Sequence, residues 1–205
     1  MKIFTGTAET LPAGMLLAMA RYRHQVFVER LGWTLQSHAG MEFDQFDRRD
    51  TVYVVACDPQ ARVIGTARLL PTHRPYLLAE VFPELLGDAP APRTPLVWEI
   101  SRFAAVKLED DKARSTMFST SFSLDLLRAA MAVARSAGAR RLISVSPVGI
   151  ERILRRGGFR IERAAAPLCI DGQALFACWL ELQPCAQPVR CDRRQAGSRS
   201  YPASP

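Results

Sequence analysis

The sequence predicts a three-layer α/β/α sandwich around one mixed β-sheet. Two β-rich runs with a hairpin signal between them come early in the chain, and strands alternate with helices after them. Alternating strands and helices typically form a sheet that is covered by helices on both faces. The chain has 205 residues, of which 48% are hydrophobic, and this is enough for the core of one domain.

The first 70 residues predict one helix and one strand pair. Apolar residues at helical spacing run through residues 15–30, whereas residues 36–50 are polar and carry four acids, which predicts a loop. Residues 51–57 and 63–70 are rich in β-forming side chains. The connection between them, Asp-Pro-Gln-Ala-Arg, is typical of a hairpin.

The chain from residue 78 onward predicts alternating helices and strands. The expected elements are a short helix at 78–86, a strand at 96–106, a helix at 115–137, a strand at 141–146, a helix from Pro147 to 156 and a last strand at 174–182. Proline suits the first turn of a helix, and the pair Gly157–Gly158 suits its end. The chain becomes rich in Pro, Ser and Arg from residue 184, so we expect a single domain over residues 1–183 and a basic, disordered tail over residues 184–205.

The formal net charge of +7 and the pI of about 9.6 favour an acidic partner. Nucleic acid, an anionic membrane surface and an acidic carrier protein all fit this charge. No stretch is apolar and long enough for a signal peptide or a bilayer span, so we expect a cytoplasmic protein without membrane insertion. The five cysteines and three histidines show no metal-ligand spacing, and we therefore expect reduced thiols and no metal site.

Two arginines, Arg68 and Arg102, lie inside otherwise apolar strands, and Glu99 precedes Arg102 by three residues. A buried guanidinium is costly unless it is paired, so each arginine predicts a carboxylate partner. Asp44, Asp47 and Glu99 are the candidates. A structural ion-pair network would explain this pattern as well as an active site would.

The residues that stand out follow one another over a hundred positions. They are Arg23, Val26, Phe27, Leu31 and Trp33, then residues 42–47, Arg68, Phe82 and residues 98–103. In this order and spacing they resemble the LuxI-type acyl-homoserine lactone synthases, or autoinducer synthases. The resemblance is dense over residues 1–106 and looser to about residue 182.

The resemblance implies a fold similar to that of the N-acetyltransferases, with a V-shaped opening between central strands of a bulged sheet. It also implies a reaction of quorum sensing. An acyl-acyl carrier protein would donate its acyl chain to S-adenosylmethionine, which is a substrate, so no cofactor is expected. The products would be an N-acyl-homoserine lactone, methylthioadenosine and free carrier protein.

Glu99, Arg102 and Phe103 are the expected catalytic residues. Glu99 would take a proton from the substrate α-amine through water, because a glutamate pKa near 4.3 lies about four units below that of the amine. A salt bridge to Arg102 or Arg68 that holds the cleft together is the alternative role. Glu99 and Arg102 would face opposite sides of a regular strand, so their joint use requires a bulge at residues 101–103. Such a bulge would also free a backbone N–H for the thioester carbonyl.

The resemblance makes Arg23, Phe27 and Trp33 contacts of S-adenosylmethionine, because an arginine pairs with a carboxylate and aromatic faces attract a sulfonium. Core packing is the alternative for the two aromatic residues. Asp44 and Asp47 are expected to brace Arg23 and Arg68 more than to touch substrate. The full set of substrate-binding candidates is Arg23, Phe27, Trp33, Asp44, Asp47, Arg68, Phe82, Ser101, Ser144 and Ser146.

The acyl chain is expected among apolar residues of the later strands and the long helix. The candidates are Phe103, Met117, Leu124, Leu142 and Val145. In the family, a threonine on the strand that matches residues 141–146 accompanies 3-oxo chains. Here that strand carries Ser144 and Ser146, and one neutral hydrogen bond discriminates weakly, so we expect an unsubstituted chain of about eight carbons.

The carrier protein is acidic, and the resemblance places its contacts at Arg152 and Arg156, on the helix after Pro147. A solvated cationic face is the alternative for each of these arginines.

Two other functions remain as alternatives. An acetyl-CoA-dependent N-acetyltransferase would use a Gly-rich turn after the bulged strand to hold pyrophosphate, but residues 107–114 contain three acids and no glycine. A basic nucleic-acid-binding module would cluster its arginines with exposed aromatic residues. The most distinctive arginines lie instead within apolar strands, which disfavours that class.

Overall fold

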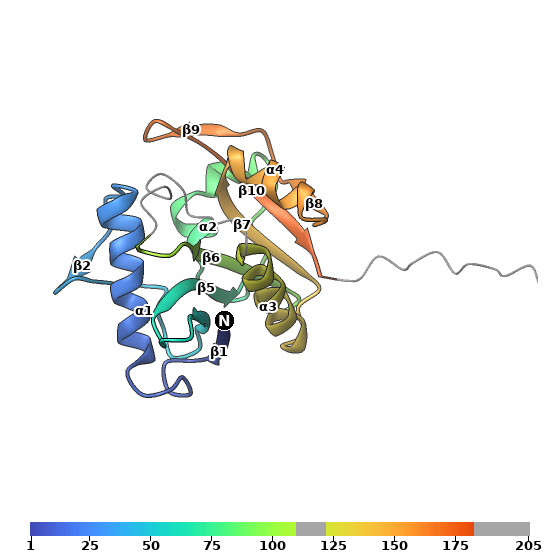
Figure 1. Cartoon of the computed structure of the whole chain (residues 1–205). Helices are drawn as coiled ribbons and strands as arrows, with labels where there is room; N and C mark the ends of the chain where they lie inside the picture. Colours follow the sequence, from blue (N-terminus) through green and yellow to red (C-terminus); the bar gives the residue numbers. More distant parts are fainter. Residues whose placement is uncertain (110–121, 183–205) are drawn as a thin grey trace, which may run out of the picture.

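A mixed sheet forms the middle layer of the protein (Figure 1). The structure, a computed structural model, describes residues 1–109 and 122–182. The strands of the sheet are β1 (Lys2–Gly6), β4 (Val52–Cys57), β5 (Val63–Pro71), β6 (Val97–Ala105), β7 (Arg141–Pro147), β8 (Ile161–Arg163), β9 (Leu168–Ile170) and β10 (Gln173–Glu181). Their order is β1-β4-β5-β6-β7-β10-β8, with β9 also paired to β10. The pair β6–β7 is parallel and the other pairs are antiparallel.

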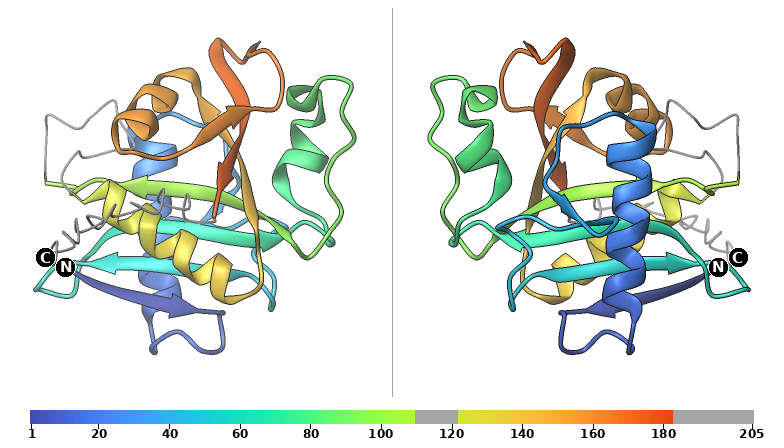
Figure 2. Two further views of the ribbon diagram at one scale, coloured as in Figure 1. Left: turned by 90° about the vertical axis from the view of Figure 1, so that its right-hand side faces the viewer. Right: turned by 90° about the vertical axis from the view of Figure 1, so that its left-hand side faces the viewer.

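Helices cover both faces of this sheet, which confirms the predicted sandwich. One face carries α3 (Ser123–Ser136) and α4 (Val148–Arg156). The other face carries α1 (Met15–Arg23), which continues as the π-helix η1 (His24–Arg30), and α2 (Leu77–Val81), which is followed by the 3-10 helix η2 (Pro83–Leu86). Figure 2 shows α1 and α3 on opposite sides of the sheet. A separate ribbon of β2 (Ser37–His38) and β3 (Met41–Glu42) follows η1.

Side chains of the central strands alternate between two apolar clusters. Leu69 and Ile100 belong to the cluster under α3, whereas Leu70 and Ile143 belong to the cluster under α2. This alternation is the period-2 arrangement of strand side chains, which explains why near-continuous apolar runs form these strands. Both faces of the sheet are therefore buried at its centre.

A bulge interrupts β6 at Arg102 and Phe103. On β5, Ala67 alone stands opposite these two residues. Arg102 has a φ of 49°, which is a left-handed conformation that is uncommon for a residue with a side chain. The extra residue turns Arg102 to the same face as Ser101, and Phe103 faces α3. The bulge that the sequence predicts for residues 101–103 is confirmed.

The parallel strands β6 and β7 diverge after a short paired stretch. Their last register pair is Glu99 with Ile143, although β6 continues to Ala105 and β7 to Pro147 within the described residues. This divergence is the V-shaped opening that the family resemblance implies. Glu99 lies at the apex of the V.

Most expected elements are confirmed with shifted ends, and a few differ. β1 is not predicted, because its five residues, KIFTG, are too few to establish an alternating pattern. The first helix changes to a π-helix at His24. The helix expected at 115–137 is described only from Ser123, and its first residues and the tail at 184–205 lie outside the described residues. The boundary between domain and tail stays a prediction.

Within residues 1–109 and 122–182, no helix is long and apolar enough to cross a bilayer.

Candidate active site

Three arginines converge on the face of the sheet that α1 covers. Arg23 comes from α1, Arg68 from β5 and Arg102 from β6, and they expose 0%, 0% and 8% of their surface. Three buried positive charges repel one another and lose their hydration, so they are tolerated only if carboxylates neutralise them. The fold must therefore bring acids to the same place.

The acids come from one short segment between the first helix and β4. Glu42 ends β3, and Asp44 and Asp47 follow it in a turn. In that turn the backbone N–H of Asp44 donates to Asp47 Oδ2, and that of Phe46 donates to Asp44 Oδ1, both at 2.8 Å. Such side chain to backbone bonds are typical of aspartates in turns, and they hold both carboxylates in fixed orientations.

Arg23 is held by two of these acids. Its Nε donates to Glu42 Oε2 at 2.5 Å, and its two terminal nitrogens donate to the two oxygens of Asp47 at 2.8 and 3.0 Å. The contact with Asp47 is a bidentate pair, the strongest geometry for an arginine and a carboxylate. All nitrogens of the Arg23 guanidinium are therefore engaged.

Arg68 and Arg102 share the third acid. Arg68 Nη1 lies 2.5 Å from Asp44 Oδ1 and 3.3 Å from Asp47 Oδ2, and its Nε donates to Ser101 Oγ at 3.1 Å. Arg102 Nη2 donates to Asp44 Oδ2 at 2.7 Å. Asp44 therefore bridges two adjacent strands of the sheet.

The six charges close into a ring. Arg102 also donates to Glu42 Oε1 at 3.0 Å, so each acid bridges two arginines. The order around this ion-pair ring is Arg23, Glu42, Arg102, Asp44, Arg68, Asp47 and back to Arg23. Three positive and three negative charges balance within it, which is the condition for burying them together.

The ring controls ionisation at its centre. Burial opposes the ionisation of Asp47, but Arg23 and Arg68 outweigh burial and lower the pKa of Asp47 to about 2. The Tyr53 hydroxyl donates to Asp47 Oδ1 at 3.1 Å, and burial together with that carboxylate raises the pKa of Tyr53 above its usual value. Asp47 is therefore ionised and Tyr53 protonated at physiological pH.

Glu42 is a ring member that the sequence analysis does not place among the site residues. Its side chain is fully buried between Arg23 and Arg102. A count of charges could have found it, because three buried arginines and two aspartates leave one positive charge unmatched. Glu42 and Asp50 are the other acids of the polar segment, and Asp50 pairs with Arg48 and Arg74 instead.

Glu99 is not part of the ring. It is fully buried, and its Oε1 and Oε2 accept the backbone N–H groups of Leu78 and Leu77 at 2.7 and 3.1 Å. Burial raises the pKa of Glu99, although the two N–H groups and the charges of Arg68 and Arg102 act in the opposite direction. The expected alternative role, a salt bridge to Arg68 or Arg102, is wrong, because both guanidinium groups pair with ring acids instead.

Phe27 packs beside the ion-pair ring, and Trp33 packs on Phe27. The rings of Phe27 and Trp33 stack at 5.0 Å between centroids with an interplanar angle of 16°, and the Arg102 guanidinium lies 5.9 Å from the Phe27 centroid. Phe27 is fully buried and Trp33 is half-buried. Phe27 thus packs as a core residue, whereas Trp33 stays partly accessible.

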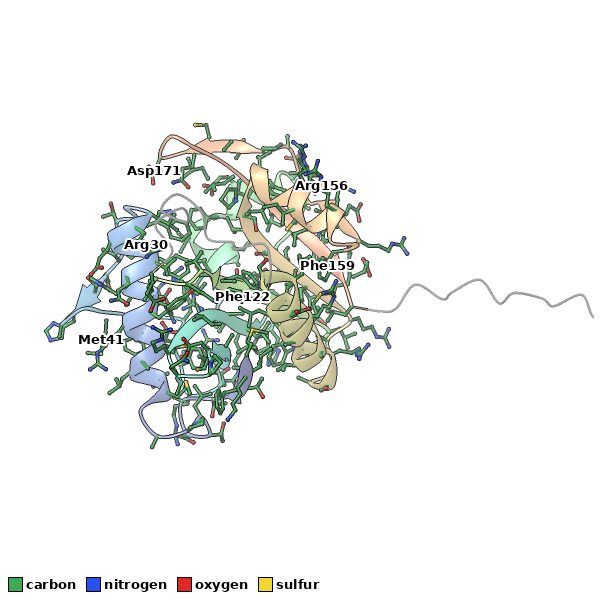
Figure 3. All side chains as sticks on the ribbon, in the orientation of Figure 1. Arg30, Met41, Phe122, Arg156, Phe159 and Asp171 are labelled. Carbon is green, nitrogen blue, oxygen red and sulfur yellow. The ribbon has the colours of Figure 1, made fainter. Side chains whose placement is uncertain are left out.

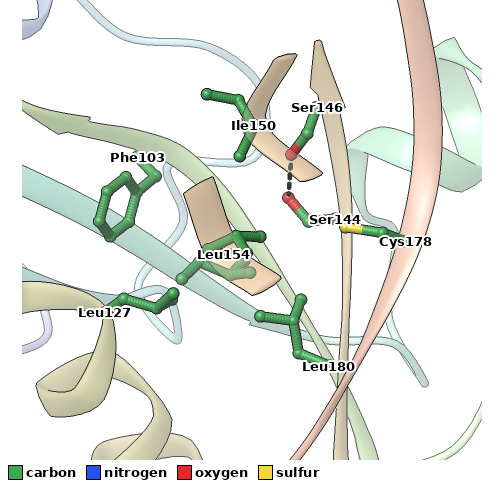
Figure 4. A pocket seen from close by; sticks show the side chains of 9 residues that line it. Phe103, Leu127, Ser144, Ser146, Ile150, Leu154, Cys178 and Leu180 are labelled. Carbon is green, nitrogen blue, oxygen red and sulfur yellow. Dashed lines mark hydrogen bonds between the residues drawn. The ribbon is translucent and has the colours of Figure 1, made fainter. Parts of the chain in front are cut away.

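An apolar pocket lies on the opposite face of the sheet, beneath α3 and α4 (Figure 4). Its lining residues are Ile100, Phe103, Leu127, Ser144, Ser146, Ile150, Leu154, Cys178 and Leu180. The space among these side chains is about 320 Å³, a volume that includes open solvent at the mouth of the pocket. The Ser144 and Ser146 hydroxyls lie 3.5 Å apart on one wall, and Ser144 Oγ also donates to the Val145 carbonyl at 3.3 Å.

The bulge connects the two faces. Arg102 belongs to the ring on one face, and the next residue, Phe103, lines the pocket on the other. The V-shaped opening lies beside them, between β6 and β7. A polar charged site and an apolar cavity therefore meet across one layer of backbone.

Some predicted site residues belong neither to the ion-pair ring nor to the lining of the apolar pocket. Phe82 packs with the apolar cluster under α2 and η2, and Val145, expected in the acyl pocket, faces the same cluster because strand side chains alternate. Leu124 and Leu142 do not line the described pocket, and Met117 lies outside the described residues.

The predicted docking arginines lie on the outer surface of α4. Arg152 and Arg156 are both exposed there, and Figure 3 shows Arg156 at the edge of the molecule. Their neighbour Arg155 is instead paired with Glu151, at 3.0 Å. In the part of the chain that the structure describes, neither Arg152 nor Arg156 has a carboxylate partner, so both remain available to an external one.

Comparison with known proteins identifies relatives along nearly the whole chain. The family model of the autoinducer synthases matches residues 11–187. An acyl-homoserine-lactone synthase of Acinetobacter nosocomialis is 45% identical over 89% of this chain and 100% of its own length. The crystal structure of TofI in a ternary complex with an inhibitor and MTA is 47% identical, covers 89% of this chain and 92% of its own, and has a TM-score of 0.76.

More distant structures share the architecture. BjaI, a CoA-dependent acyl-homoserine lactone synthase solved with SAM and isopentyl-CoA, is 27% identical over 88% of this chain and 83% of its own, with a TM-score of 0.76. A structure assigned to an N-acetyltransferase of Lactobacillus plantarum is 22% identical over 89% of this chain and 98% of its own, with a TM-score of 0.55, and shares the fold alone.

Replacing Glu42 with Gln should cost the protein about 3 kcal/mol of unfolding free energy, because two buried arginines would each lose a charged partner. Urea denaturation measures this loss. The matched control is Glu9→Gln, which removes an exposed pair with Arg49 and should cost less than about 1 kcal/mol. Equal losses in the two variants would show that the ring contributes no more than a surface ion pair.

Proposed function

The chain belongs to the autoinducer synthase family, and on that premise we propose that it joins an acyl chain from acyl carrier protein to S-adenosylmethionine. It is an acyl-homoserine-lactone synthase, an acyltransferase that makes a quorum-sensing signal. The observation that carries this function is the meeting of the ion-pair ring and the apolar pocket at the bulge of β6. One face suits a charged, zwitterionic acceptor, and the other suits a fatty acyl chain.

S-adenosylmethionine is placed on the ring side, as a substrate and not as a cofactor. The half-buried Trp33, stacked on Phe27, offers an aromatic face to the sulfonium through cation–π attraction. The Arg68 Nη2 group is buried and has no hydrogen-bond partner among residues 1–109 and 122–182, which suits the substrate carboxylate. Arg23 is saturated by Glu42 and Asp47, so it supports the site from behind.

The acyl chain is placed in the pocket, with its thioester at the bulge. The neutral α-amine attacks the thioester carbon, the new C–N bond forms, and the C–S bond to the carrier protein breaks. The proton that the nitrogen loses ends on the leaving thiolate, directly or through water. Arg102 is the ring arginine that belongs to the bulge, so we assign to its guanidinium the stabilisation of the negative oxygen in the tetrahedral intermediate.

Ring closure needs no further acid or base. The carboxylate of the acylated intermediate attacks its own γ-carbon, and the C–S bond to the sulfonium breaks at the same carbon. Methylthioadenosine leaves as a neutral thioether. The step depends on a curled conformation of the substrate, which the walls of the ring-side site would enforce.

Acyl carrier protein is the proposed donor because the exposed arginines of α4 offer a cationic surface to an acidic partner. The glycine-free, acidic sequence at residues 107–114 disfavours the pyrophosphate of coenzyme A. Both donors and S-adenosylmethionine are made in the cytoplasm, where we place the enzyme. Acyl-coenzyme A is the second candidate donor, since BjaI was solved with isopentyl-CoA.

Purified protein should convert octanoyl-acyl carrier protein and S-adenosylmethionine to octanoyl-homoserine lactone, with a kcat/KM at least about tenfold above that for octanoyl-coenzyme A. Mass spectrometry of the lactone and of methylthioadenosine measures both reactions. A higher kcat/KM with coenzyme A would reverse the donor assignment. Acetylated amines without any lactone would contradict the function itself.

Charge reversal on α4 should separate the two substrates. Arg152→Glu with Arg156→Glu should raise the KM for acyl-acyl carrier protein and leave that for S-adenosylmethionine unchanged, with a smaller effect in high salt, because exposed charges are screened over about 8 Å at physiological ionic strength. The control is Lys2→Glu with Arg21→Glu, an equal charge change at exposed positions on β1 and α1. If the control raises the same KM equally, net charge and not a docking face is responsible.

The serine pair should have a modest effect on the choice between an unsubstituted and a 3-oxo acyl chain. Octanoyl should outcompete 3-oxo-octanoyl carrier protein in one reaction, and Ser146→Ala should increase that preference by about fivefold, the value of one neutral hydrogen bond. The ratio of the two lactones measures it. Ser144→Ala tests the neighbouring hydroxyl, and Ser136→Ala, at an exposed helix position, is the control. A wild-type product pool dominated by the 3-oxo lactone would contradict the preference for an unsubstituted chain.

A further inference from the structure

The start of α2 has no acceptor of its own. The first backbone N–H groups of a helix lack partners within the helix, and a Ser, Thr, Asp or Asn at the N-cap usually accepts one of them. Here the N-cap residue is Tyr76, in an extended conformation, and its side chain makes no capping bond. The N–H groups of Leu77 and Leu78 therefore depend on an acceptor from another part of the chain.

Glu99 is that acceptor. It lies on β6, more than twenty residues away, and each of its oxygens accepts one of the two N–H groups, at 3.1 Å from Leu77 and 2.7 Å from Leu78. A carboxylate with two N–H donors at the start of a helix combines charge-assisted hydrogen bonds with a favourable helix dipole. Glu99 thus caps α2 across the fold.

The cap lies where β6 and β7 begin to separate. Glu99 belongs to the last paired position of β6 and β7, where the V-shaped opening begins. The helices that follow the cap, α2 and η2, supply Leu78, Leu85 and Leu86 to the apolar cluster that also contains Ile143 of β7. Glu99 therefore connects the apex of the V to the layer that packs beneath it.

We infer that Glu99 is a positioning residue, which holds α2 and η2 against the apex of the V, and that it is not the proton acceptor for the substrate amine. This inference rests on the proposed function. Its carboxylate is fully buried, and both oxygens already bind backbone N–H groups. A strong base is also dispensable, because an α-amine with a pKa near 8 is roughly one-tenth neutral at pH 7.

The structure offers a variant that separates the two roles. In Glu99→Gln, the amide keeps one oxygen for a single N–H group, but its NH₂ group faces the second N–H, donor against donor. Leu77→Pro removes that second N–H. Proline suits the first position of a helix, and the extended Tyr76 before it suits a residue that precedes proline.

The experiment is a double-variant cycle on kcat/KM for lactone formation. Glu99→Gln should lower kcat/KM by at least about tenfold when residue 77 is Leu, and by less than about threefold in the Leu77→Pro background, because the proline variant has no N–H to leave facing the amide. A proton acceptor would be lost equally in both backgrounds, and that result would overturn the inference. Glu80→Gln, an exposed glutamate on the same helix, is the isosteric control and should change neither value.

Hydrogen exchange gives a second readout that needs no substrate. In Glu99→Gln, the amides of residues 77–82 should exchange faster than in the wild type, while those of the β4–β5 hairpin should not change. Unchanged exchange at residues 77–82 would overturn the capping role. If the wild type makes no lactone, the proposed function fails, and hydrogen exchange still decides whether Glu99 caps α2.

Discussion

Three arginines and three carboxylates share one buried ring, and most of the site depends on it. The arginines come from one helix and two strands, whereas the acids come from a single segment of six residues, 42–47. Breaking a buried ion pair leaves an uncompensated charge, which is far more costly than losing a surface pair. The helix, the two strands and the acidic segment are therefore stable only in one arrangement. That arrangement places Arg102 over Phe27, on which Trp33 stacks.

The bulge of β6 is the second constraint, and the ring explains how it persists. Arg102 occupies a left-handed conformation, which costs free energy for any residue other than glycine. The ion pairs of Arg102 with Glu42 and Asp44 offset that cost, because they form only if its side chain is turned to the ring face. The same turn sends Phe103 into the apolar pocket. Because of this one strained residue, the charged site and the apolar pocket lie on opposite faces of the sheet at adjacent positions of β6.

Several parts of this arrangement were predictable from local patterns. Period-2 and period-3.6 apolar runs predict the central strands and the main helices, because each element must bury one face. The bulge is predicted because Glu99 and Arg102, three positions apart, can lie on the same face of a strand only if the strand contains an extra residue. β1 is not predicted because five residues give too little periodicity, and its place at the end of the strand order makes it an edge strand. The π-helix has no signal in the pattern, since it differs from an α-helix by the register of its hydrogen bonds.

By itself, the sequence determined the layers of the fold, the need of Arg68 and Arg102 for carboxylates, and the family resemblance that points to the reaction. Only the tertiary structure decided which groups meet. The N–H groups that bind Glu99 belong to the start of a helix more than twenty residues away. A backbone N–H carries no net charge, so matching acids with arginines along the sequence cannot identify it as a partner. Glu42 and Asp44, and not Glu99, pair with Arg102, because the acidic segment brings both carboxylates to the ring face while the oxygens of Glu99 accept backbone N–H groups. Long-range pairing of this kind depends on distances in space, which residue spacing does not encode.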